Sequence, residues 1–170
     1  MEFLNPILQR LPDSAKDVRL NLDSVVARSS LSPEDALGVA IAAAFAARSA
    51  ELVQAFKSAA PAAEANAALT AAALMGMNNV WYPFVEMAGD DELKSMRPEL
   101  RMNAYATHGG VARAKFEAYA LAASIVGKCH FCVSSHYALL KKEGLTTQQL
   151  RDIGRIAAVV NAAAQAIAAG

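Results

Sequence analysis

Alanine fills most of the apolar positions of this chain, and this choice constrains the fold more than any other feature. Alanine has the highest intrinsic helix propensity, and it is depleted in strands. Clusters of β-branched and aromatic residues are sparse, as are runs in which apolar and polar residues alternate. We therefore expect an all-α protein in which the 170 residues form one domain with a sizeable core.

Start and stop signals divide the chain into helices. Ser32 can cap a helix, Pro33 suits the first helical position, and Asp35 completes a capping box. Pro83 is expected to end or kink a helix, and Gly127 is expected to stop another. Residues 89–98 predict a polar connection, and residues 108–110 predict a turn. The expected helices run from about 13 to 28, 33 to 47, 49 to 59, 62 to 82, 112 to 126, 129 to 143 and 146 to 169.

A weak internal repeat is visible at an offset of 83 residues, with Glu34 matching Glu117 and Asn78 matching Asn161. It suggests two similar halves, 15–95 and 98–170, with redox chemistry only in the second. Because alanine-rich helices align with one another easily, a chance match is the alternative.

Charge and hydropathy give little sign of a nucleic-acid or membrane partner. Lys and Arg together number 16, as do Asp and Glu, so the formal net charge is zero. No strongly basic surface is therefore expected to attract nucleic acid or an anionic membrane. The N-terminus lacks the pattern of a signal peptide, and the apolar stretches are too short or too polar to cross a bilayer. We expect a cytoplasmic protein.

The two cysteines of the chain form one motif, Cys129-x-x-Cys132, and His136 follows four residues later. The motif is expected to open a helix, where unpaired backbone N–H groups and the helix dipole stabilise a thiolate. In a reducing compartment such a pair is more often catalytic or metal-binding than a static crosslink. The pattern indicates a redox dithiol that can close to a Cys129–Cys132 disulfide.

Helical spacing makes the two cysteines unequal. Cys132 and His136 are four residues apart and share a helix face, so His136 is expected to act as the base for Cys132. Cys129, at the start of the helix, is expected to be the more exposed thiol that resolves or exchanges. Cys132 would then react with a peroxide to form a sulfenic acid, Cys129 would condense with it, and an external dithiol would reduce the disulfide.

Other interpretations of these residues stay open. Cys129, Cys132 and His136, with His130 or His108, could bind zinc in a metal-stabilised helical interaction module. The cysteines could also be inert core residues. Covalent haem attachment is excluded because no histidine follows Cys132 directly.

Several further side chains have both a structural and a functional interpretation. Glu117 could be a solvated acid in the first turns of its helix or a catalytic group. His108 is expected to be a turn residue. Four side chains near the end of the 62–82 helix are expected to serve packing or an interface, namely Asn78, Asn79, Trp81 and Tyr82.

The pattern Glu117, Cys129-x-x-Cys132 and His136 resembles the signature of AhpD-like alkyl hydroperoxidases, within the carboxymuconolactone decarboxylase-like superfamily. The resemblance extends from the Ser32-Pro33-Glu34 helix through residues 77–80 to the last helix. It implies an all-α, AhpD-like fold of two similar halves, usually assembled as a homotrimer. It implies an antioxidant enzyme with no bound cofactor that takes electrons from the lipoyl group of a lipoylated acyltransferase. The electrons pass to a partner peroxiredoxin, AhpC, or directly to an organic hydroperoxide.

The resemblance also implies roles for the site residues. Glu117 would act as the distant base of a relay through water and His136 to Cys132, and Cys129 would be the partner thiol. Many relatives have histidine immediately before the second cysteine, where this chain has Phe131. Its nearest histidine, His130, lies one residue earlier and is a weak candidate for the relay. Another dithiol reductase of the same superfamily remains an alternative.

Overall fold

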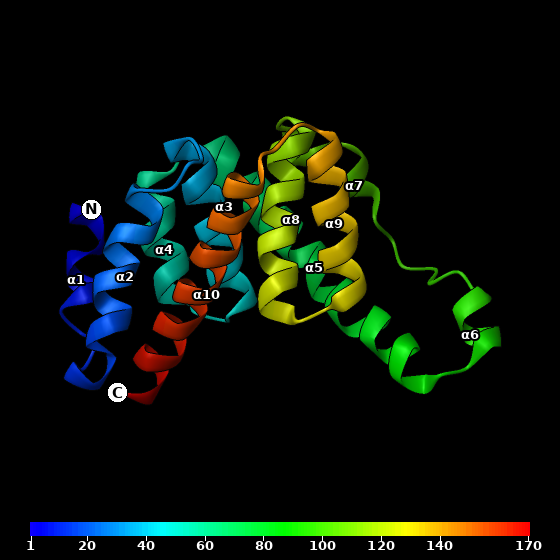
Figure 1. Ribbon diagram of the computed structural model, residues 1–170, viewed down its shortest axis with the longest axis horizontal. Coiled ribbons are helices and arrows are strands. Elements are labelled where there is room, and N and C mark those ends of the chain that lie inside the picture. Colours follow the sequence, from blue (N-terminus) through cyan, green and yellow to red (C-terminus); the bar gives the residue numbers. More distant parts are fainter.

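The computed structural model describes residues 1–170 as ten α-helices and three short 3-10 helices, with no strand (Figure 1). The expected all-α fold is therefore confirmed. The α-helices are α1 (Asn5–Leu8), α2 (Lys16–Ala27), α3 (Pro33–Ala46), α4 (Ala50–Ala59), α5 (Ala62–Ala88), α6 (Asp91–Ser95), α7 (Asn103–Ala106), α8 (Arg113–Gly127), α9 (His130–Lys142) and α10 (Thr147–Ala169). The 3-10 helices are η1 (Glu2–Leu4), η2 (Asp13–Ala15) and η3 (His108–Gly110).

Two helices, α3 and α8, form the centre of the core. Each has nine consecutive buried residues, 36–44 in α3 and 116–124 in α8. A helix that is buried on every side must be surrounded by other helices. Small side chains also let the two helices approach closely: a Cβ on Gly38 would overlap the ring of Tyr119. The alanine-rich composition thus produces a tight helical core.

The remaining helices cover this pair. Helices α4, α5 and α10 pack against α3, while α5, α9 and α10 pack against α8. Helix α2 lies along α10 (Figure 1). No helix is both long and apolar enough to span a membrane.

The expected helix starts agree with the structure. The Ser32 hydroxyl accepts a hydrogen bond from the backbone N–H of Asp35, as an N-cap should. At the start of α10, Thr146 and Gln149 form a reciprocal capping box.

Of the two expected helix ends, the one at Gly127 is confirmed and the one at Pro83 is wrong. Pro83 does not end α5, which continues to Ala88 and stops before Gly89, where φ is +67°. Proline removes one backbone donor, but its φ is itself helical, and α5 is also held by packing against α8 and α9. Gly127 is the last residue of α8, and Lys128 adopts the left-handed conformation, with φ +57°.

A closely packed side chain explains why glycine stands at 127. A Cβ there would overlap the side chain of Asn79. The Asn79 amide donates to the carbonyl of Ala123 at 3.1 Å. Gly127 therefore allows α5 to approach α8 just before the cysteine motif, and this role is distinct from stopping the helix.

The end of α5, helix α6 and the segment that follows form an arm, residues 83–102, which extends away from the helical body (Figure 1). The starts of α3 and α8 differ by 80 residues, those of α4 and α9 also by 80, and those of α5 and α10 by 85. A repeat of three helices remains a proposal, and two of its three helix starts have an offset of 80 rather than 83.

Candidate active site

The cysteine motif opens helix α9. Cys129 is the N-cap, and its Sγ accepts a hydrogen bond from the backbone N–H of Cys132 at 3.3 Å. The two cysteines form a disulfide with their Cα atoms 5.3 Å apart. The left-handed turn at Lys128 brings α9 back along α8, so the motif lies at the junction of these two helices.

The two sulfurs differ in access, in the opposite sense to the expectation. Cys129 is fully buried, whereas Cys132 is 3% exposed and lines a pocket. The prediction that Cys129 is the more exposed thiol is wrong. An N-cap side chain turns back over the first turn of its own helix to reach the backbone N–H groups, and here this direction leads into the protein.

Glu117 and His136 meet across the junction between α8 and α9. Glu117 Oε2 and His136 Nδ1 lie 2.6 Å apart. The Glu117 side chain is completely buried and His136 is nearly so. The interpretation of Glu117 as a solvated acid is therefore wrong, although it lies within two turns of the start of α8.

Glu117 is held as a carboxylate. Its other oxygen, Oε1, accepts a hydrogen bond from the Tyr105 hydroxyl. Burial alone would raise the pKa of Glu117, but the hydrogen bonds from His136 and Tyr105, together with the charges of His136 and Arg113, bring its pKa below the ordinary value. Burial and the neighbouring carboxylate raise the pKa of Tyr105 well above its usual range. The proton of this pair therefore stays on the phenol.

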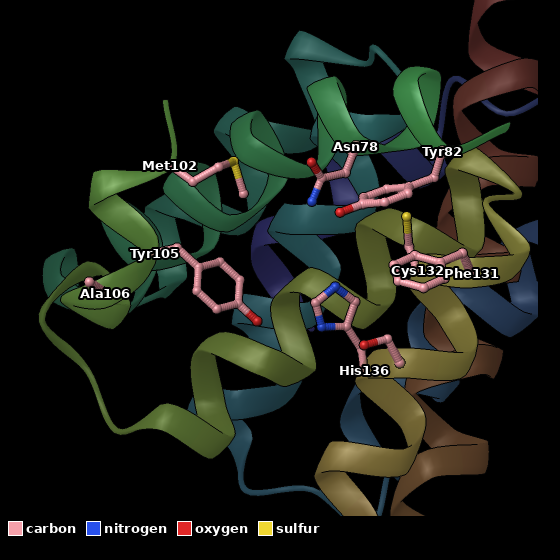
Figure 2. A pocket seen from close by; sticks show the side chains of 9 residues that line it. Asn78, Tyr82, Met102, Tyr105, Ala106, Phe131, Cys132 and His136 are labelled. Carbon is pink, nitrogen blue, oxygen red and sulfur yellow. The ribbon is translucent and has the colours of Figure 1, made fainter. Parts of the chain in front are cut away.

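The second nitrogen of His136, Nε2, lies 3.2 Å from the thioether sulfur of Met75 on α5. No hydrogen bond joins His136 to Cys132 in this disulfide form, so the predicted pairing remains a prediction. Both side chains nevertheless line the same pocket, which brings the imidazole and the sulfur to one space (Figure 2).

This pocket, which we call the Cys132 pocket, has a volume of about 350 Å³. Figure 2 shows the His136 ring between Tyr105 and Cys132, with Tyr82 over the sulfur. The lining residues are Asn78, Tyr82, Met102, Tyr105, Ala106, Phe131, Cys132, Ser135 and His136.

Sequence reasoning missed part of this site. Asn78 and Tyr82, expected to serve packing or an interface, belong to the pocket wall. Their spacing of four on one helix face could have indicated a shared surface. Tyr105 and Met75 had no signal of their own, because their importance depends on which helices pack together.

The structure does not bring His130 into the Cys132 pocket. His130 is highly exposed, and its Nδ1 lies 3.5 Å from Glu86 Oε1. It lines a neighbouring groove of about 640 Å³ beside the arm. Phe131 lies between the two spaces and stacks on Tyr82, with ring centroids 4.3 Å apart.

Nowhere in the structure do three or more His, Cys, Asp or Glu side chains gather in a way that could hold a metal ion. His108 lies in η3 with φ +50°, as expected for a turn residue, and packs near the Tyr105 ring.

The fold and the motif define a class: all-helical proteins with a Cys-x-x-Cys at a helix N-terminus. Residues 91–169 match the model of the Carboxymuconolactone decarboxylase family. Similar proteins include Alkyl hydroperoxide reductase AhpD of Rhodospirillum centenum, 44% identical over 91% of this chain and 85% of the relative. AhpD of a Bradyrhizobium strain is 41% identical over 98% of this chain and 93% of the relative, and AhpD of Brucella canis is 35% identical over 98% and 97%. This chain belongs to the AhpD family of alkyl hydroperoxide reductases.

Proposed function

We propose that this chain is a thiol-dependent hydroperoxidase and disulfide reductase that works through Cys129 and Cys132. One observation carries the proposal: Cys132 opens onto a pocket whose wall also contains His136, and His136 is backed by a buried carboxylate. A nucleophile, a group that moves protons and an oriented acceptor are the parts that thiol catalysis needs.

In the peroxide half-reaction, the Cys132 thiolate attacks one oxygen of an organic hydroperoxide. The O–O bond breaks, the alkoxide takes a proton from His136 to leave as an alcohol, and Cys132 becomes a sulfenic acid. The Cys129 thiolate then attacks the Cys132 sulfur, the S–O bond breaks, and water leaves after protonation. The apolar walls of the pocket suit a substrate with an alkyl or aryl group.

In the reductive half-reaction, a dihydrolipoyl thiolate attacks the disulfide at Cys132, the sulfur that lines the pocket. Cys129 leaves as a thiolate, stabilised by the N–H of Cys132 and the N-terminus of α9. The second lipoyl thiol then resolves the mixed disulfide, and the lipoyl group leaves oxidised. The dithiol could pass its electrons to the disulfide of a partner peroxiredoxin by the same exchange. Because a reduced lipoyl pool is needed, we also propose a cytoplasmic location.

A coupled assay tests this function, with dihydrolipoamide, lipoamide dehydrogenase and NADH as donor and cumene hydroperoxide as acceptor. We expect Cys132→Ser to abolish turnover and Ser134→Ala, a change on the exposed face of α9, to leave it intact. Full activity of Cys132→Ser would sink the mechanism. Lipoamide-linked disulfide reduction without peroxide consumption would instead support another dithiol reductase, and stoichiometric zinc with no titratable thiols would support a metal-stabilised module.

Trapping distinguishes the two sulfurs. After peroxide treatment, Cys129→Ser should form a sulfenic acid that dimedone traps, because the remaining thiol lines the pocket. Trapping only in Cys132→Ser would reverse the assignment.

A homotrimer is also part of the proposal. Large apolar side chains are exposed at the end of α5 and along the arm, which is typical of a surface covered by other copies. They are Val80, Phe84, Met87, Met96 and Leu100. Light scattering should give the mass of a trimer for the native protein and a smaller mass for Met87→Glu. Leu20→Glu, an equivalent change on α2, should leave the mass unchanged.

A further inference from the structure

Tyr105 stands on α7, a four-residue helix between the arm and α8. Its ring forms part of the wall of the Cys132 pocket and packs edge-to-face on Phe116, with centroids 5.5 Å apart. Its hydroxyl donates to Glu117 Oε1, beyond the wall (Figure 2 shows the ring pointing toward His136). Tyr105 is thus a pocket-lining side chain that binds the buried carboxylate directly.

The two oxygens of Glu117 have separate partners, Tyr105 on Oε1 and His136 on Oε2. A carboxylate that accepts from two sides is fixed in orientation, whereas one held on a single side can rotate about its terminal bond. Since the ionised carboxylate only accepts, Nδ1 of His136 must carry the hydrogen. The other nitrogen, Nε2, is then the atom that can exchange a proton with a thiol or a leaving group.

We propose that Tyr105 is a positioning residue that holds Glu117 as an oriented acceptor and thereby fixes which nitrogen of His136 exchanges protons. The proposal rests on the proposed function, in which Glu117 and His136 activate Cys132. It adds that the short helix α7, which forms one wall of the substrate pocket, also sets the protonation of the relay.

Two other side chains near Glu117, Arg113 and His108, do not hydrogen-bond to its carboxylate. Arg113, one turn earlier on α8, lowers the pKa of Glu117 by its charge, and it also lies 3.7 Å from Glu143. His108 lies against the Tyr105 ring rather than the carboxylate. The Tyr105 hydroxyl and the His136 imidazole are therefore the two groups that hydrogen-bond to Glu117.

The test is Tyr105→Phe, which removes the hydroxyl and keeps the ring. Loss of this donor raises the pKa of Glu117, so the group becomes protonated at higher pH. The acid limb of the pH–rate profile should therefore move up by about one unit, and the rate on that limb should fall about tenfold. Tyr137→Phe on the exposed part of α9 is the matched control and should leave the profile unchanged.

A readout without peroxide or lipoamide separates this proposal from the proposed function. In the Cys129→Ser background, serine keeps an N-cap acceptor, and alkylation by iodoacetamide then reports on Cys132 alone. The pH midpoint of alkylation should rise in Tyr105→Phe. A raised midpoint in a protein without peroxidase activity would support the role of Tyr105 while the proposed function fails. An unmoved midpoint in an active enzyme would overturn the role of Tyr105.

A double-mutant cycle guards against a simple folding defect. If Tyr105 acts through Glu117, then Tyr105→Phe should have no further effect on the midpoint once Glu117→Gln is in place. Equal effects in both backgrounds would overturn the proposal, because they would indicate a change in the pocket wall alone.

Discussion

Two buried glutamates, Glu117 and Glu64, have the same kinds of hydrogen-bond partner but lie in different surroundings. Each accepts a hydrogen bond from a tyrosine hydroxyl and pairs with a basic side chain. The partners are Tyr105 and His136 for Glu117, and Tyr119 and Lys115 for Glu64. In both, hydrogen bonds outweigh the effect of burial, and the pKa of the glutamate lies below its usual value. A tyrosine hydroxyl and a basic side chain therefore keep a buried carboxylate ionised, but these two partners alone do not make a catalytic site.

The difference lies in the basic partner and in what adjoins it. The hydrogen bond with Glu64 raises the pKa of Lys115, which also lies 3.3 Å from Asp35, so its proton is held permanently. His136 has an imidazole whose second nitrogen, Nε2, does not face the carboxylate, and it lines a pocket that also contains the Cys132 sulfur. We infer that the Glu64 cluster clamps α3, α5 and α8 together, while the Glu117 cluster moves protons.

Exchanging each glutamate for glutamine should separate the two roles most clearly. Glu117→Gln presents an amide N–H to His136 and favours the wrong tautomer, so kcat should fall by about 100-fold or more. Glu64→Gln should leave kcat within about twofold and lower the free energy of unfolding by roughly 1–3 kcal/mol, because Lys115 loses a charged partner. Urea titration and the coupled peroxidase assay measure the two effects.

Two outcomes would contradict the division into a catalytic glutamate and a structural one. A Glu64→Gln variant that is stable but inactive would mean that the clamp also takes part in catalysis. Equal losses of stability and activity in both variants would mean that the two clusters cannot be separated.

Removing the tyrosine of the clamp should affect stability alone. The Tyr119 side chain is fully buried and donates to ionised Glu64. Hydrogen bonds to charged groups contribute about 1.5–3 kcal/mol, so Tyr119→Phe should destabilise the protein by about 2 kcal/mol. The pH–rate profile should stay in place, in contrast to that of Tyr105→Phe. A shifted profile for Tyr119→Phe would show that the two clusters are coupled through α8.

A third buried carboxylate, Asp152, resembles Glu64 in having only structural partners. It accepts from the backbone N–H and hydroxyl of Ser30 and from Arg151 and Arg155. Burial would raise its pKa, but these bonds lower the pKa to about 2. Since the native pKa lies below the unfolded value near 4, the stabilisation is complete above about pH 4 and is lost as the pH falls toward 2.

Asp152→Asn should therefore lower the free energy of unfolding at pH 7 by roughly 2 kcal/mol. The variant should also show a weaker loss of stability between about pH 4 and 2 than the native protein. Thermal unfolding across this range measures both, with the exposed Asp91→Asn as control. Parallel acid profiles for the two proteins would contradict the assignment.

The features that could be predicted from the sequence are those that depend on residues a few positions apart. The all-helical fold followed from the alanine content, and the cap at Ser32 followed from N-terminal preferences that act over four residues. Cys132 and His136 could be placed on one face because they share a helix. The end of α8 at Gly127 was also predicted, but the need for glycine there was not, because it depends on the Asn79 side chain of another helix.

The rest of the site depends on which helices become neighbours. Contact between Glu117 and His136 requires that α9 return along α8, and neither residue carries that information. Tyr105 lies in a short helix without apolar periodicity, so no pattern marked it. Even the burial of Cys129 reflects the direction in which an N-cap side chain points relative to α5, as its Sγ lies 3.9 Å from the Asn78 carbonyl.

The smallest expected effect concerns Met75, whose thioether sulfur contacts His136. The Glu64 cluster has no such sulfur contact. The Met75 sulfur lies 3.2 Å from His136 Nε2, so it takes up space beside the nitrogen to which the Cys132 thiol would donate. Met75 is fully buried, and leucine has a similar volume, so Met75→Leu should change stability by less than about 1.5 kcal/mol.

Release of Nε2 should raise the rate of Cys132 alkylation about twofold, as expected for loss of a contact that contributes a few tenths of a kcal/mol. Leu74→Met, on the same helix and outside the Cys132 pocket, is the control for packing. A tenfold loss in Met75→Leu would contradict this account, because it would mean that the thioether orients the imidazole as strongly as Glu117 does.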